Sequence, residues 1–69
     1  MPVTAKRVVR FLKRRGWLES RQRGSHLLLI ELGTGRRVVV PMHAGDLHKG
    51  TLLEILKDAG FTLEELRRD

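Results

Sequence analysis

The chain has 69 residues, with 14 lysines and arginines against 8 aspartates and glutamates, a formal net charge of +6 and no cysteine. This length suits one small domain, and the composition excludes disulfides and zinc–thiolate centres. The longest apolar run, Leu27–Ile30, is far shorter than the roughly 20 residues that a membrane-spanning helix needs. We therefore expect a single domain over residues 1–69 and no membrane segment.

The positive charge is concentrated in the first two thirds of the chain. After Gly50 the balance reverses, because three basic residues then stand against five acidic ones. A strongly basic segment indicates a polyanionic partner, so a nucleic-acid surface is expected before Gly50.

The segment Met1–Leu18 is basic and amphipathic, as mitochondrial presequences are, but so short a chain could not lose it and still fold. We therefore expect a cytoplasmic protein.

The first predicted element is a helix from Thr4 to Arg15, with Thr4 as its N-cap and Gly16 as its end. An apolar stripe runs along one side, and Phe11 lies on its flank. The opposite side is cationic and forms a candidate phosphate-binding face, for which an ordinary solvated face is the alternative. The stripe contains Ala5, Val8, Val9 and Leu12, and the cationic side contains Lys6, Arg7, Arg10, Lys13 and Arg14.

Three antiparallel strands are predicted next, over residues 17–22, 25–32 and 36–42, with turns at Arg23-Gly24 and at 33–35. The second strand is apolar on both faces, because Leu27 and Leu29 alternate with Leu28 and Ile30. Two helices can cover only one face of such a sheet. We therefore infer that a partner chain or a second copy, in a homo-oligomer, covers the other face.

The last part of the sequence predicts a helix over 49–59 that ends at Gly60, followed by a capping box over 62–65 that begins a short terminal helix. The inward residues of the longer helix are expected to be Leu52, Leu53, Leu56 and Ala59. The fold class is thus α+β in the order α-β-β-β-α. It has a three-stranded antiparallel sheet, helices packed on one face and a short extra C-terminal helix.

Histidine is the main candidate for chemistry, since this side chain transfers protons near neutral pH. His26 follows Arg21-Gln22-Arg23-Gly24-Ser25, so its imidazole should emerge at a sheet end among cations, where a phosphodiester could bind. A structural role at the head of an apolar strand is the alternative. Arg36 and Arg37 occupy consecutive strand positions and point to opposite faces, so only one can reach the ligand of His26. They could equally protect an exposed sheet edge.

Residues His43, Asp46 and His48 combine ligand types that can bind zinc. They fall in a predicted loop without a fixed helical spacing, and Gly45 suits the turn of such a loop. We therefore predict no metal site there.

Three segments in this order resemble the HicA family of bacterial and archaeal toxins, over nearly the whole chain. They are Arg21-Gln22-Arg23-Gly24-Ser25-His26, the stretch from Gly35 to His43, and the stretch from Gly50 to Phe61. The resemblance implies a fold like that of double-stranded-RNA-binding domains. It also implies an mRNA interferase of a type II toxin–antitoxin system that needs no metal or other cofactor and is neutralised by a HicB-type antitoxin.

In the HicA family the catalytic histidine belongs to a Gly-Ser-His motif, which falls on Gly24, Ser25 and His26 of this sequence. The resemblance assigns Gly24 to the turn and Ser25 to a phosphate contact. Many relatives carry a second histidine directly after the first, where this chain has Leu27. Two alternatives stay open: a nucleic-acid-binding module that recognises RNA by shape and cleaves nothing, and an inactive orphan toxin.

Overall fold

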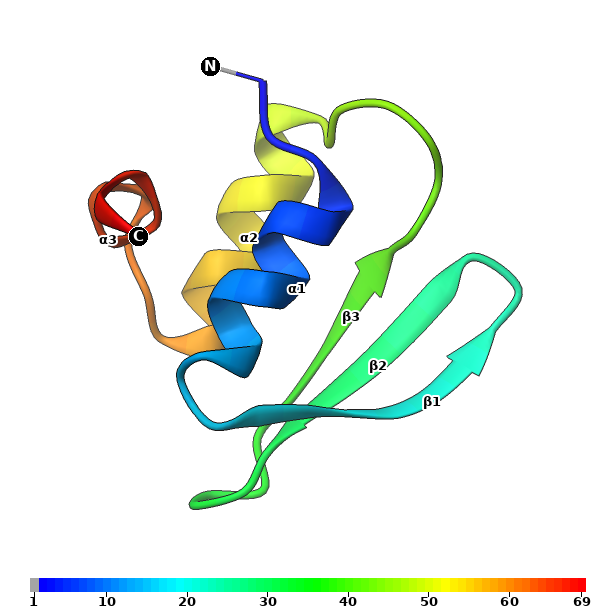
Figure 1. Cartoon of the computed structure of the whole chain (residues 1–69), viewed down its shortest axis with the longest axis vertical. Coiled ribbons are helices and arrows are strands. Elements are labelled where there is room, and N and C mark those ends of the chain that lie inside the picture. The colour runs from blue at the N-terminus through cyan, green and yellow to red at the C-terminus, as the bar shows by residue number, and fades with distance from the viewer. Residues whose placement is uncertain (1) are drawn as a thin grey trace.

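The computed structural model describes residues 2–69 and shows two longer helices on one side of a twisted sheet (Figure 1). The sheet is antiparallel, with the strand order β1-β2-β3. This arrangement confirms the predicted α+β class, including the short extra helix at the C-terminal end. The elements are α1 (Ala5–Lys13), β1 (Trp17–Arg23), β2 (His26–Glu31), β3 (Arg37–Pro41), α2 (Lys49–Ala59) and α3 (Leu63–Arg68).

Helix α1 begins as predicted, because the Thr4 hydroxyl accepts a hydrogen bond from the Arg7 N–H at 3.2 Å. It ends at Lys13, two residues earlier than Arg15. The Arg15 N–H donates to the Leu12 carbonyl at 2.9 Å and the Gly16 N–H donates to the Lys13 carbonyl at 3.4 Å, so the chain tightens into a turn there. Gly16, at φ +88°, then allows the chain to leave for β1.

The core lies between the sheet and the two longer helices. Phe11, expected on the flank of the α1 stripe, is fully buried. In α2, Ile55 is buried and Leu53 is 40% exposed, so the expected position of Leu53 in the core was wrong. Positions at i, i+3, i+4 and i+7 share one side of a helix, and Leu52, Ile55, Leu56 and Ala59 have that spacing.

Helix α2 ends in the predicted glycine cap. Gly60 has φ +86°, its N–H donates to Lys57 at 3.0 Å, and the Phe61 N–H donates to Leu56 at 2.8 Å, which together define a Schellman motif. The Phe61 ring then packs edge-on against Phe11, with ring centroids 5.1 Å apart. The capping box that begins α3 is also confirmed, since the side chain of each of Thr62 and Glu65 accepts a hydrogen bond from the backbone N–H of the other.

The pairing of β1 with β2 contains a bulge. Leu18 lies opposite Ile30 and Glu19 opposite Leu29, but the next pair joins Arg21 to Leu28, so Ser20 is an extra residue in β1. Leu18 and Arg21 therefore both point to the sheet face that the helices leave open, which we call the outer face.

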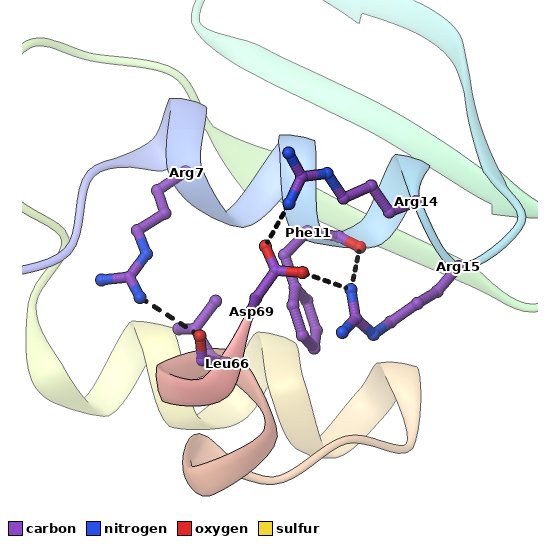
Figure 2. Close-up of polar contacts among 6 residues, drawn as sticks. All are labelled: Arg7, Phe11, Arg14, Arg15, Leu66 and Asp69. Carbon is purple, nitrogen blue, oxygen red and sulfur yellow. Dashed lines mark hydrogen bonds and ion pairs between the residues drawn. The ribbon is translucent and has the colours of Figure 1, made fainter.

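Helix α3 is joined to α1 by arginine side chains (Figure 2). Arg7 donates to the Leu66 carbonyl at 3.1 Å, while Arg14 and Arg15 donate to the Asp69 carboxylate at 3.3 and 2.9 Å. Only 7% of the Asp69 side-chain surface is exposed. The hydrogen bond from Arg15, with the positive charges of Arg14 and Arg15, holds the pKa of Asp69 below its ordinary value of 3.8.

The Asp69 pairing predicts a pH-dependent contribution to stability. A carboxylate whose pKa is lowered by folding stabilises the native state above its ordinary pKa, and loses that effect as the pH falls through its folded value. The Asp69→Asn variant should therefore unfold at a lower urea concentration than wild type at pH 7. The difference should shrink as the pH falls below 3.8. Urea titrations of both proteins at pH 7 and at a pH below 3.8 would check this. The same difference in unfolding midpoint at the two pH values would contradict it.

No helix within residues 2–69 has the length and apolar character that crossing a membrane requires.

Candidate functional site

His26 is the first residue of β2 and lies exposed at the end of the sheet. It pairs with Arg23 on β1 and with Pro41 on β3. Its near neighbours in the strand, Leu27 and Leu29, are buried against the helices, so strand alternation turns His26 to the outer face. The histidine therefore does not belong to the hydrophobic core.

A two-residue turn formed by Gly24 and Ser25 places His26 beside Arg23. Gly24 has φ +54° and Ser25 has a negative φ, the pattern of a type II′ hairpin turn. The Gln22 side-chain amide donates to the Gly24 carbonyl at 3.1 Å and holds the turn. The turn thus lies one residue later than the predicted Arg23-Gly24. Its glycine provides the positive φ that a side chain at this position would oppose.

The outer face is hollowed next to the histidine. A shallow depression of about 230 Å³ is lined by His26, Arg21, Arg23, Leu28 and Val39. The β1 bulge is necessary for this grouping, since it returns Arg21 and Arg23 to the outer face after Glu19 has pointed toward the helices. The site therefore combines one imidazole and two guanidinium groups around an apolar floor.

Two of these lining residues, Leu28 and Val39, were not among the predicted site residues. Strand alternation already puts Leu28 two residues from His26 on the same face. Val39 is found only through the register of β2 and β3, in which it lies opposite Leu28. Placing Val39 in the site requires the register between two strands. A sequence predicts that register less well than it predicts the alternation of side chains within one strand.

The cations of α1 do not join the His26 depression. Lys6, Arg10, Lys13 and Arg14 line a separate groove of about 480 Å³, whose floor includes Met42. Met42 follows the alternation of the buried residues Val38 and Val40, so this groove lies on the helix side of the sheet.

Several of the α1 cations are already paired. Lys13 forms an ion pair with Glu19 on β1, Arg14 pairs with Asp69, and Arg7 donates to Leu66. The predicted cationic face of α1 is therefore divided. Lys6, Arg10 and Lys13 face the groove, Arg14 both lines the groove and pairs with Asp69, and Arg7 instead contacts α3 through the Leu66 carbonyl.

The two arginines at the start of β3 point in different directions, as their consecutive positions predicted. Arg37 lies opposite Ile30 and so belongs to the outer face. Arg36 instead reaches the end of α2, where its guanidinium lies 3.5 Å from the Ala59 carbonyl. A cation at this position is favourable because helix carbonyls at a C-terminus carry partial negative charge. Of this pair, Arg37 is the residue on the same face as His26.

The loop between β3 and α2 holds His43, Asp46 and His48. The Asp46 backbone forms an isolated bridge with Thr4, and His48 precedes α2 without a side-chain capping bond. Within residues 2–69, no group of three or more histidine, cysteine or carboxylate side chains is placed to hold a metal ion.

The site can bind an anion and transfer a proton. Guanidinium groups pair with phosphate oxygens, and an exposed imidazole can accept or donate a proton at neutral pH. The protein is thus a small basic α+β domain with an exposed histidine and two guanidinium groups on its open sheet face. This is the class of protein that the fold and the site define together.

Comparison with known families gives the identity of that class. The family described as "HicA toxin of bacterial toxin-antitoxin" matches residues 5–61, which include all three strands, α1 and α2. The chain therefore belongs to the HicA toxin family of bacterial toxin–antitoxin systems. No curated protein matches the chain at a significant level.

Proposed function

We propose that the protein is an mRNA endoribonuclease that needs no metal and uses His26 as its proton-transfer group. The observation that carries this proposal is the exposed imidazole in one depression with Arg21 and Arg23. Membership of a toxin family supports it, since cleavage of mRNA would stop translation in the cytoplasm. Ser25, in the turn beside His26, is the proposed phosphate contact.

The proposed reaction is an internal transesterification. His26 takes the proton from a ribose 2′-hydroxyl, whose oxygen then forms a bond to the adjacent phosphorus as the bond to the 5′-oxygen breaks. Arg21 and Arg23 stabilise the extra negative charge on the phosphoryl oxygens. The leaving 5′-oxygen takes a proton from water, because the lining of the depression contains only one imidazole, and the proton that His26 took then neutralises the hydroxide that remains. The products are a 2′,3′-cyclic phosphate and a 5′-hydroxyl.

The antitoxin is proposed to be a HicB-type protein that covers the outer face. Leu18 and Val39 are 52% and 50% exposed there, and Leu28 and Ile30 are half-buried. Such an apolar surface beside three arginines suits an apolar and acidic partner surface. Covering this face would bury His26 and offset the positive charge around it.

The experiment that tests the proposed activity is cleavage of a long mRNA in excess EDTA, followed by analysis of the product ends. Cleavage with 2′,3′-cyclic phosphate ends is expected. Products with 5′-phosphate ends, or activity that EDTA abolishes, would overturn the mechanism. The same RNA with its 2′-hydroxyls replaced by hydrogen is the control substrate, because it lacks the nucleophile and should stay intact.

A non-catalytic RNA-binding module is the second candidate. It is favoured by the openness of the site, where the single imidazole has no second proton-transfer group beside it in the depression. Such a module would retain RNA binding without cleavage, and alanine at His26 would change neither property strongly.

A further inference from the structure

The free edge of β3 is a second feature of the sheet that binding could use. In the β2–β3 pair, the Glu31 N–H donates to the Arg36 carbonyl and the Met42 N–H donates to the Ser25 carbonyl. Antiparallel pairs alternate between bonded and non-bonded positions, so Val38 and Val40 are also bonded to β2. It follows that Arg37 and Val39 direct their N–H and carbonyl groups away from β2, to the open edge.

A groove lies along this edge, between β3 and α2. It has a volume of about 600 Å³, and its β3 wall contains Arg37, Val38 and Val39. The α2 wall contains Gly50, Thr51, Glu54, Ile55 and Asp58. The groove therefore combines two unpaired backbone donors, exposed apolar surface at Val39 and two carboxylates.

The carboxylates distinguish this groove in a chain whose net charge is +6. Within residues 2–69, neither Glu54 nor Asp58 takes part in an ion pair, and both are exposed. They are four positions apart on α2, a rise of about 6 Å along the helix axis. Alternate residues of an extended strand are about 6.8 Å apart on one face, so two cationic side chains of a strand match this spacing.

We propose that this groove binds an extended segment of a partner protein, which adds to β3 as a fourth strand and carries lysine or arginine at alternate positions. Its backbone accepts hydrogen bonds from the Arg37 and Val39 N–H groups, and its cations face Glu54 and Asp58. The proposal goes beyond the nuclease assignment and does not require cleavage. A toxin–antitoxin pair supplies a protein partner by its nature.

A second copy of this chain fits the groove less well than such a segment. Two β3 strands joined edge to edge would lie about 4.8 Å apart. Helix α2 packs on β3 in each copy, and packed helices need their axes about 8–10 Å apart. The two α2 helices would therefore collide, whereas a strand without a covering helix would not.

Pro41 limits the length of the added strand. Like Arg37 and Val39, Pro41 occupies a position whose backbone groups face the open edge. Proline has no backbone N–H, so the edge offers no donor there. The docked segment therefore gains two backbone donors from β3. Val39 lines both this groove and the His26 depression, so an occupied groove would also border the proposed catalytic site.

The test titrates the isotope-labelled full chain with a capped heptapeptide of alternating lysine and valine, followed by NMR. The amide resonances of Arg37 and Val39 are expected to shift most. A capped heptapeptide of alternating glutamate and valine should not bind. Binding of both peptides or no binding of the lysine peptide would overturn the proposal. So would resonance shifts centred on the groove that Lys6, Arg10 and Lys13 line.

Two charge-reversal variants complete the experiment. Glu54→Lys should weaken binding of the lysine peptide by roughly fivefold, the upper range for an exposed ion pair. Glu64→Lys reverses an exposed carboxylate on α3 and changes the net charge equally, so it should leave the affinity nearly unchanged. Equal weakening in both variants would show a general charge effect and overturn the proposal. His26→Ala should bind the peptide like wild type, which separates this test from the nuclease assignment.

Discussion

Replacement of His26 by alanine is expected to slow RNA cleavage by about 100- to 10,000-fold, the range that positioned proton transfer contributes. The side chain is exposed and lies outside the hydrophobic core, so its loss should not disturb the fold. Initial rates on a long mRNA in EDTA would measure the effect, with circular dichroism and thermal unfolding as checks of folding. RNA binding should persist, because Arg21 and Arg23 remain.

His48→Ala is the matched control for this variant. His48 is also exposed, but it precedes α2 and its side chain forms no capping bond. We expect a cleavage rate close to that of wild type. If His26→Ala also cleaved at the wild-type rate, the proposed proton-transfer role would be refuted. If neither wild type nor variant cleaved while both bound RNA, the binding-module alternative would hold.

The second large effect concerns stability. Phe11→Ala should destabilise the fold by about 3–5 kcal/mol, the usual loss for a buried aromatic residue. Phe11 is fully buried, its ring meets Phe61 edge-on, and the Arg15 guanidinium lies 3.8 Å from its centroid. A single core in a domain of this size supplies only about 3–5 kcal/mol in total. We therefore expect the variant to be largely unfolded at room temperature.

Leu53→Ala provides the comparison for Phe11→Ala. Leu53 is a large apolar residue on a helix, but 40% of its surface is exposed. Its truncation removes little buried area and should cost no more than about 1 kcal/mol. Urea unfolding of both variants would measure the difference. Similar midpoints for the two would contradict the assignment of Phe11 to the centre of the core.

The sequence was sufficient to predict the order of the elements and most of their ends. These features depend on short-range signals: the Thr4 and Thr62 caps, the Gly60 cap and the alternation of apolar residues in β2. Each of these signals depends on only a few neighbouring residues in the sequence. The boundary of α1 differed by two residues because the last turn tightened, a change that helix propensity does not encode.

Long-range contacts were beyond the reach of sequence patterns. Nothing in α1 shows that Arg7 and Arg14 contact residues more than 50 positions away, at Leu66 and Asp69. The grouping of all α1 cations on one phosphate-binding face assumed that no later element covers part of it. The assignment of Leu53 to the core failed for a similar reason, since helix rotation is set by the surface against which the helix packs.

The candidate site was predicted in part. The placement of His26 at a sheet end among arginines followed from the order of residues, and the opposite directions of Arg36 and Arg37 followed from strand alternation. The capping of α2 by Arg36 and the lining by Val39 depend on how three elements meet in space. The roles proposed for these residues in catalysis and RNA binding stay predictions.

The bulge at Ser20 makes the length of β1 as important as its composition. Regular pairing of all seven β1 residues would turn Arg21 and Arg23 toward the helices and leave Gln22 on the outer face, and the bulge at Ser20 prevents this. A chain without Ser20 would pair regularly and keep both arginines on the outer face, whereas a further residue inserted before Arg21 would need a second bulge to do so. Alignments of relatives should therefore show either the bulge residue or a one-residue gap in its place, with other gaps in the 32–36 turn or the 42–48 loop, where a change of length leaves the two arginines facing the same way as His26.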